Sequence, residues 1–213
     1  MKQKFEAIEA DKVYDKSLFD IPNAYSDSIQ SVLIPPGLIR NRVSKLARNI
    51  ANELPENVEA ITLVCVLKGA FRFSSMLMEE LVKLTDIPVI MEFIRMKSYH
   101  NDVSTGDVQI LGELPSNVIK DKFVVVVEDI IDTGKTMKVL CEMLNQLGPY
   151  KCLIATLLWK ELQTEREVVP HYVGFLIPDV FVIGFGLDYN EFFRDLDAIC
   201  VINEYGKEKF KIK

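Results

Sequence analysis

Apolar residues along the chain follow two patterns, continuous runs and helical spacing. The continuous runs ITLVCVL, VIMEFI, FVVVV and CLIATLL cover residues 61–67, 89–94, 123–127 and 152–158. Each run has the length of a β-strand, and continuous apolar runs are typical of strands that are buried on both faces of a parallel sheet. The sequence therefore predicts at least four buried strands.

Before and between these runs, apolar residues recur every three or four positions, as they do on one face of a helix. Segments with this spacing cover residues 39–54, 73–84 and 137–147, and the last of them stops at Gly148 and Pro149. Alternating strands and helices predict an α/β fold with a doubly wound parallel sheet.

Two regions depart from this alternation. Residues 97–107, KSYHNDVSTGD, are polar and lie between two strand-like segments. A loop of this length in a compact domain is typical of a lid or of a disordered segment. From residue 173 onward, short strand-like runs are punctuated by Pro178 and Gly184, which predicts an added subdomain rather than another repeat of the sheet.

Composition narrows the functional classes. The chain has 213 residues, of which 49% are hydrophobic, so a single domain with a large core is expected. A net charge of -6 argues against nucleic-acid or anionic-membrane partners. The N-terminus is charged throughout and no apolar run approaches the length of a membrane span, so we expect a cytoplasmic protein. The four cysteines lack metal-type spacing and are expected to be free thiols.

The stretch FVVVVEDIIDTGKT, residues 123–136, carries the main candidate chemistry. A buried strand runs directly into Glu128 and Asp129, and a third acid, Asp132, precedes a loop that leads into a helix. In parallel sheets, ligands bind beyond the carboxyl ends of strands, where helix N-termini favour phosphate. A nucleotide-triphosphate P-loop is excluded because its first glycine is replaced by Asp129.

An acid pair beside a phosphate-binding loop suits a ribose phosphate. Carboxylates accept hydrogen bonds from two vicinal hydroxyls, while the loop at the helix N-terminus holds the phosphate. The alternative interpretation is a strand end whose acids only face solvent.

The residues that carry this pattern resemble those of a known family. VVVVEDIIDTGKTM is similar to the diphosphoribosyl-binding motif of the type I phosphoribosyltransferases. Further segments resemble the members of this family that act on hypoxanthine and guanine: LKGAF, KSYHNDVSTGD, LLWK, IPDVFVIGFGLDYNEFFRDL and ICVI. The resemblance begins near Val13. It implies a type I phosphoribosyltransferase fold, in which a core at about 37–172 carries a hood at about 1–36 and 173–213.

The resemblance also implies the reaction and its site. The 5-phosphoribosyl group of phosphoribosyl diphosphate would pass to a 6-oxopurine base with the help of Mg²⁺. Glu128 and Asp129 would bind the ribose hydroxyls beside one metal, and Asp188 would meet a second. The remaining implied contacts form two groups. The 5′-phosphate loop and the residues that lead into it are Ile130, Ile131, Thr133, Gly134, Lys135 and Thr136. The diphosphate-binding residues are Lys68, Gly69, Ser98, Tyr99 and Arg194.

Five implied residues would bind the purine. Asp132 would accept the proton of the imidazole ring and Lys160 would donate to the 6-oxo group. Phe181 would stack on the ring, and the backbone of Val182, with that of Asp188, would read its edge. From pattern alone these residues have other interpretations: Asp132 as a helix N-cap, Lys160 as a solvated lysine and Phe181 as a core residue.

Two implied features concern the loops. Gly69 is expected to permit an unusual backbone conformation. The polar segment 97–107 is expected to close as a lid, in which Ser98 and Tyr99 reach the diphosphate, because the reactive sugar must be shielded from water. The alternative is a disordered surface loop.

Departures from the family pattern affect only finer properties. Ala70 replaces a second glycine, Gly186 replaces an alanine, and ELQTERE at 161–167 replaces a more basic segment. These changes bear on purine preference and substrate affinity. Two alternatives of other classes are a catalytically silent, nucleotide-binding paralogue and a nucleic-acid-binding regulator on the same fold. The family suggests a homodimer or homotetramer.

Overall fold

The computed structural model describes residues 6–98, 108–161 and 166–212. Its four α-helices are α1 (Pro36–Asn52), α2 (Phe71–Val82), α3 (Lys135–Gln146) and α4 (Glu204–Lys209). The strands are β1 (Ile8–Glu9), β2 (Ile29–Ile34), β3 (Ile61–Leu67), β4 (Val89–Ser98), β5 (Val108–Leu111), β6 (Phe123–Ile131), β7 (Lys151–Lys160), β8 (Tyr172–Ile177), β9 (Val182–Ile183) and β10 (Ile199–Ile202). Two short 3₁₀ turns, η1 (Lys16–Leu18) and η2 (Ser116–Val118), complete the described elements.

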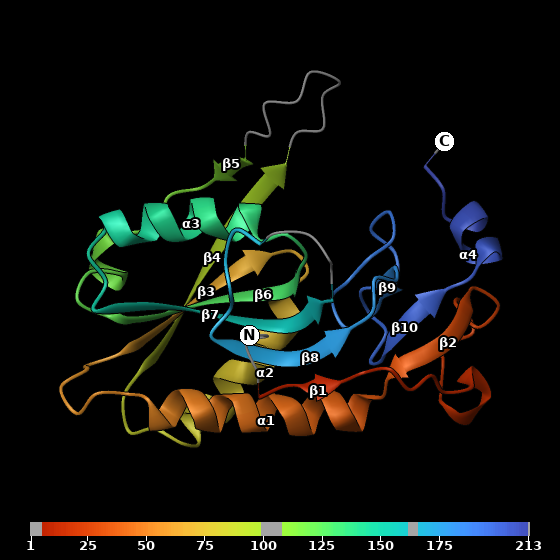
Figure 1. Ribbon diagram of the computed structural model, residues 1–213, viewed down its shortest axis with the longest axis horizontal. Coiled ribbons are helices and arrows are strands. Elements are labelled where there is room, and N and C mark those ends of the chain that lie inside the picture. The colour runs from red at the N-terminus through yellow and green to blue at the C-terminus, as the bar shows by residue number, and fades with distance from the viewer. Residues whose placement is uncertain (1–5, 99–107, 162–165, 213) are drawn as a thin grey trace.

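A seven-stranded sheet forms the centre of the molecule, with the strand order β1-β8-β7-β6-β3-β4-β5. All neighbours in it pair in parallel except β4 and β5, which are antiparallel. Helices α1 and α2 cover one face of this sheet and α3 covers the other (Figure 1). The prediction of an α/β fold with a mostly parallel sheet is confirmed.

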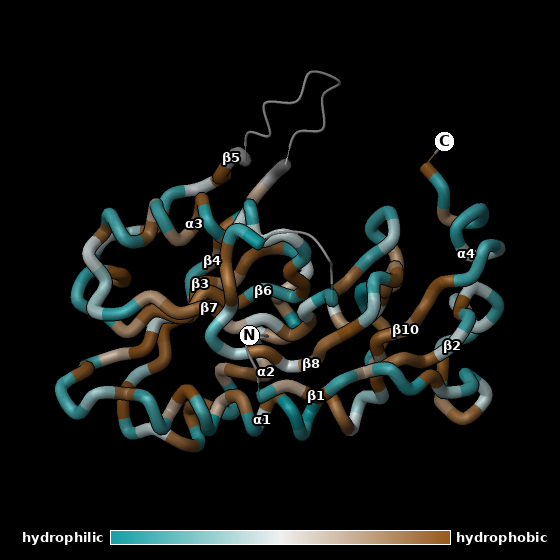
Figure 2. Tube along the Cα trace, viewed as in Figure 1, coloured by the Kyte–Doolittle hydropathy of each residue, from teal (hydrophilic) through white to brown (hydrophobic). Residues whose placement is uncertain are grey.

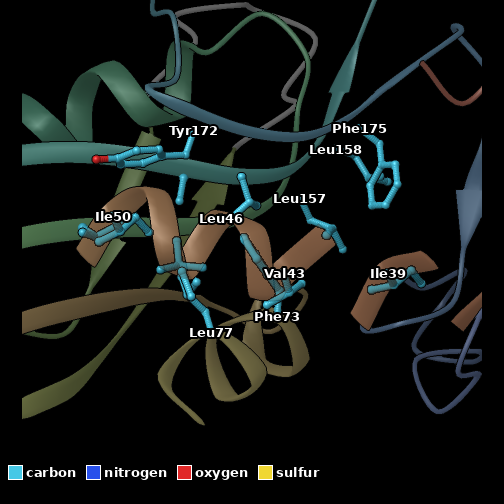
Figure 3. Packing of buried hydrophobic residues seen from close by; sticks show 14 of the residues in the cluster. Ile39, Val43, Leu46, Ile50, Phe73, Leu77, Leu157, Leu158, Tyr172 and Phe175 are labelled. Carbon is cyan, nitrogen blue, oxygen red and sulfur yellow. The ribbon is translucent and has the colours of Figure 1, made fainter. Parts of the chain in front are cut away.

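The core under α1 explains why apolar residues recur at helical spacing in this helix. Apolar residues on one side of α1 meet α2 and the strands β7 and β8, as Figure 3 shows for Ile39, Val43, Leu46, Ile50, Phe73, Leu77, Leu157, Leu158, Tyr172 and Phe175. Nearly all of these side chains are fully buried. Burying such a side chain stabilises the fold by about 1.5–3 kcal/mol, so this face anchors the sheet.

A second, three-stranded sheet with the order β2-β10-β9 lies at one end of the molecule (Figure 1). It combines an N-terminal strand with two C-terminal strands, as the predicted hood did. The boundary between core and hood differs from the predicted one, because β1 and most of β8 fall in the predicted hood ranges but pair within the central sheet. The core sheet therefore continues to Ile177.

Hydropathy follows this layering. The strands of the central sheet are apolar along much of their length, whereas polar positions gather on the outer sides of the helices and in the connections (Figure 2). In the described part of the chain, no helix has both the length and the apolar character needed to cross a bilayer.

The strand that carries the acids is longer than predicted. We expected β6 to end at Val127, but it continues to Ile131 and includes Glu128 and Asp129. Its backbone keeps pairing with β7, since Glu128 lies opposite Thr156 and Ile131 lies opposite Trp159. The two acids are therefore held by the sheet itself rather than by a loop.

Candidate functional site

The acid pair lies in the last part of β6, at the carboxyl edge of the sheet. Both residues are half-buried. One carboxylate oxygen of Glu128 accepts the Asp129 N–H at 3.2 Å, and an oxygen of Asp129 accepts the Ile130 N–H at 2.8 Å. These bonds fix the carboxylates next to their own backbone.

The pair is electrostatically strained. Burial raises the pKa of Glu128 well above its ordinary value, and the neighbouring Asp129 carboxylate raises it further. Burial also raises the pKa of Asp129, although backbone hydrogen bonds and the charge of Arg194 oppose this shift. Among the ion pairs of the described residues, none includes either acid. The pair is therefore suited to a ligand that brings positive charge or hydroxyl donors.

The loop after β3 contacts this pair directly. A Cβ atom placed on Gly69 would lie 1.6 Å from an Asp129 carboxylate oxygen, so any other residue there would have to displace that carboxylate. The expectation that Gly69 permits an unusual backbone conformation stays a prediction; its φ angle is not in the left-handed region, and the structure adds its close approach to Asp129 as a reason for the glycine. The unusual peptide bond, which is cis, is the one between Leu67 and Lys68.

The loop that follows β9 brings Asp188 and Arg194 to the same edge. Their side chains form an ion pair at 2.8 Å. Glu191 accepts from Lys68 at 2.8 Å and lies 3.5 Å from Arg194. Carboxylates thus gather the cations that are predicted to bind diphosphate.

Helix α3 begins next to the acids. Its N-cap is Gly134, which has a φ of 83° in the left-handed region. Asp132 is therefore not the N-cap, and that alternative interpretation is wrong. The helix N-terminus presents N–H groups that have no partner within the helix, which favours an anion at Thr133 to Thr136.

Ile130 and Ile131 connect the acids to this loop. Ile131 is 2% exposed and belongs to the cluster under α3, while Ile130 packs against the opposite cluster. Their side chains belong to the core, so a ligand would meet their backbone.

Asp132 and Lys160 meet across the ends of β6 and β7. The Lys160 ammonium lies 3.6 Å from the Asp132 carboxylate and 3.1 Å from the carboxylate of Asp179. Only 15% of the Lys160 side chain is exposed, so it is not a solvated lysine. The structure thus brings together a proton acceptor and a hydrogen-bond donor that lie far apart in the sequence.

Phe181 precedes β9 and is 49% exposed, so the interpretation as a core residue is wrong. Its ring makes an edge contact with Tyr189, with centroids 5.7 Å apart. Val182 is buried in β9 and pairs with Val201 of β10. The exposed ring leaves an aromatic face open for stacking.

The predicted lid cannot be compared with the structure. Tyr99 lies outside the described residues, and of Ser98 only the backbone, at the end of β4, is described. Strands β4 and β5, which pair up to Ser98 and Val108, flank the segment.

The donor set fits Mg²⁺ chemically. Mg²⁺ prefers oxygen ligands and usually binds through one or two carboxylates together with water and substrate phosphates. Glu128 and Asp129 offer such carboxylates, and Asp188 offers one that Arg194 now holds. Within residues 6–98, 108–161 and 166–212, no three metal-ligating side chains gather into a site that the protein alone would complete.

Sequence reasoning missed three residues at this edge. Glu191 pairs with Lys68, and Asp179 pairs with Lys160. Arg166 donates to the main-chain oxygens of Asp132 and Lys160. Glu191 and Asp179 lie inside the quoted motif IPDVFVIGFGLDYNEFFRDL, so their proximity to predicted site residues was a usable signal. Arg166 lies inside ELQTERE at 161–167, a segment noted only as a departure from the family pattern, and nothing local in that segment indicates its partners.

Comparison with known proteins gives a consistent result. The phosphoribosyl transferase domain family matches residues 37–190. Hypoxanthine-guanine phosphoribosyltransferases of Mus musculus and Homo sapiens are each 44% identical over 203 residues, which cover 93% of this chain and 92% of the relative.

Solved structures agree with this result. A hypoxanthine-guanine phosphoribosyltransferase from Schistosoma mansoni in complex with IMP superposes with a TM-score of 0.79 at 36% identity, covering 98% of this chain and 100% of that one. One from Bacillus anthracis gives 0.73 at 32% identity, covering 83% and 98%. The family match, the near full-length relatives and the shared fold together show that this chain belongs to the phosphoribosyltransferase family, among the hypoxanthine-guanine phosphoribosyltransferases.

Proposed function

We propose that the protein is a purine-salvage enzyme that transfers the 5-phosphoribosyl group from phosphoribosyl diphosphate to hypoxanthine or guanine. The products are IMP or GMP and diphosphate. The observation that carries this proposal is the arrangement at the ends of β6 and β7, where the acid pair, the N-terminus of α3 and the Asp132–Lys160 contact lie together. Each part suits a different group of the two substrates.

The sugar side of the reaction would use the acid pair and two loops. Glu128 and Asp129 accept hydrogen bonds from the ribose hydroxyls, and residues 133–136 hold the 5′-phosphate. Lys68 and Arg194 then exchange their contacts with Glu191 for the diphosphate, which carries more negative charge. The leaving group is thereby bound by cations that are already gathered near the sugar.

The purine side would use Asp132 and Lys160. Asp132 accepts the proton of the imidazole ring as the new bond forms, and Lys160 donates to the 6-oxo oxygen. An amino group at that position, as in adenine, would place a donor against a donor. Phe181 stacks on the ring, and the backbone at Val182 and Asp188 meets its edge.

One Mg²⁺ would be held by Glu128 and Asp129 and a second by Asp188, each together with substrate oxygens. When bound, it supplies Lewis-acid neutralisation of charge on the diphosphate. The strain of the acid pair supports this assignment, because a divalent cation would relieve the burial cost of both carboxylates.

The test is a radiolabelled assay with hypoxanthine, guanine, xanthine and adenine, each supplied with phosphoribosyl diphosphate. We expect nucleotide products from hypoxanthine and guanine, little product from adenine, and loss of turnover when a chelator removes divalent metal. Readdition of Mg²⁺ should restore the rate. Undiminished turnover after complete chelation would contradict the metal dependence, and absence of product with every base would favour a silent, nucleotide-binding paralogue.

Replacing Lys160 with methionine should lower kcat/KM for both 6-oxopurines by about 10- to 100-fold, because a buried charged hydrogen bond contributes about 1.5–3 kcal/mol. The affinity for phosphoribosyl diphosphate should change little. Steady-state kinetics with each substrate varied in turn would measure both effects. Lys207→Met on α4, which removes an exposed ion pair with Glu204, is the control. An equal loss of kcat/KM for the purine and for phosphoribosyl diphosphate would argue against a purine contact.

A cytoplasmic location and a homodimeric or homotetrameric state are also part of the proposal. Exposed aromatic rings of Phe71 and Phe93 lie 6.4 Å apart on α2 and β4, and such rings favour contact with a second chain. Light scattering after size-exclusion chromatography would determine the number of subunits.

A further inference from the structure

Residues 166–168, here called the return segment, lie against the phosphate loop. The Glu167 N–H donates to the Thr133 carbonyl at 2.9 Å. The Val168 side chain lies 2.6 Å from the point where a Cβ atom on Gly134 would be. The Arg166 guanidinium donates to the Asp132 carbonyl at 3.1 Å. The segment therefore contacts three successive residues of the loop.

Arg166 also reaches the next strand. Its second terminal nitrogen donates to the carbonyl of Lys160 at the end of β7. The guanidinium lies over the Trp159 ring, 4.1 Å from its centroid, and that ring is 4% exposed. A planar, rigid fork stacked on a buried indole has little freedom to turn. Arg166 thus joins the backbone of Asp132 to that of Lys160.

Asp132 and Lys160 are the residues that would hold the purine from two sides. Their side chains lie 3.6 Å apart, and their strands, β6 and β7, pair through Ile131 and Trp159. Beyond that point β6 and β7 no longer pair with each other, because Asp132 lies past the end of β6 and Lys160, the last residue of β7, pairs with Ile177 of β8. The Arg166 bridge spans this gap.

We propose that Arg166 is a positioning residue that sets the distance between Asp132 and Lys160 and so orients the purine for transfer. This inference rests on the proposed function. Arg166 touches neither substrate; it acts through the two main-chain carbonyls. A misplacement of about 1 Å in such a site costs about 100-fold in rate, so a bridge that fixes two contacts has a measurable effect.

The effect should fall on one substrate. The contacts of Glu167 and Val168 with the phosphate loop do not involve the guanidinium. The acid pair lies earlier in β6, and Lys68 follows β3, which borders β6 on the side away from β7. Binding of phosphoribosyl diphosphate should therefore survive the loss of Arg166, whereas use of the purine should not.

Three variants test this: Arg166→Gln, Arg166→Lys and Arg166→Ala. Lys138→Gln is the matched control, since it removes a polar side-chain contact of the return segment that does not involve Arg166, the 2.9 Å ion pair between Lys138 and Glu167. Steady-state kinetics give kcat and KM for each substrate. Thermal unfolding shows whether each variant is folded at the assay temperature.

We expect Arg166→Gln to lower kcat/KM for hypoxanthine by about 10- to 100-fold, with KM for phosphoribosyl diphosphate within about threefold of wild type. Arg166→Lys should stay impaired, because one ammonium cannot replace a two-pronged fork. Added guanidinium ion should partly restore Arg166→Ala, whereas added ammonium should not. Equal losses for both substrates, no loss, or no rescue by guanidinium would each overturn the proposal.

A second measurement separates this inference from the proposed function. If the wild-type protein makes no nucleotide, the proposed function fails. The bridge is then tested by amide hydrogen exchange of the wild type, Arg166→Gln and Lys138→Gln. Faster exchange at both strand ends, residues 130–133 and 159–161, in Arg166→Gln alone supports the bridge. Unchanged exchange there would reject it.

Discussion

Asp132→Asn should slow the chemical step of phosphoribosyl transfer by about 100- to 10,000-fold, the usual effect of losing acid-base assistance. The amide keeps the shape of the carboxylate but cannot accept the purine proton. The fold should persist, because the N-cap of α3 is Gly134 and the Asp132 contact with Arg166 uses only the main chain. Phosphate binding at the start of α3 should persist for the same reason.

Single-turnover rates measure the chemical step directly, and circular dichroism with phosphoribosyl diphosphate binding checks the fold. Asp179→Asn is the matched comparison, because it also removes one negative charge beside the Lys160 ammonium, from 3.1 Å. We expect less than about a tenfold loss in that variant, since its carboxylate only orients a donor. Similar losses in both variants would mean that Asp132 acts through Lys160 rather than as a proton acceptor.

The central sheet could be predicted because its strands are apolar on both faces. The run at 61–67 coincides with β3, and the run at 152–158 lies within β7. The ends were less predictable, since β6 extends through Glu128 and Asp129 on the strength of backbone pairing with β7, which does not depend on side-chain polarity. Similarly, a short apolar run such as 173–177 does not reveal which sheet it joins.

Site residues that lie within one sequence motif could be predicted. Contacts between segments that are distant in the sequence could not. The resemblance supplied Glu128, Asp129 and Asp132 in a single stretch. The reason for Gly69 came from a carboxylate that lies 60 residues later, at Asp129, and no local pattern contains it. Arg166 belongs to the same class, because its partners at Asp132 and Lys160 become neighbours only when β6 and β7 pair.

The double change Glu128→Gln and Asp129→Asn should reduce turnover by at least about 1,000-fold, more than the loss of a single electrostatic contact costs. Neutral amides cannot bind a divalent cation firmly, and they accept hydrogen bonds from the ribose hydroxyls less strongly than carboxylates. Initial rates with both substrates and excess Mg²⁺ would measure the loss. Glu56→Gln with Asp86→Asn, two exposed acids, is the matched control.

The same double change should stabilise the metal-free protein at neutral pH. The pKa values of Glu128 and Asp129 are raised in the folded state above the ordinary values of 4.5 and 3.8, chiefly by burial. The folded state then binds protons more tightly than the unfolded state, so the wild-type free energy of unfolding falls as the pH rises past those ordinary values. Below them, both states are protonated and the penalty disappears. The amides carry no such penalty at any pH.

The unfolding temperature, measured in a chelator without substrate, should therefore rise in the double variant by about 2–4 °C at neutral pH, the shift that about 1 kcal/mol gives in a protein of this size. The difference should shrink as the pH falls toward 4.5 and then 3.8. A variant that is equally stable or less stable than wild type at neutral pH would show that the pair is not strained. Gain of stability with loss of turnover would instead mean that these carboxylates are kept, at a cost to the fold, because the bound cation and sugar need their charge.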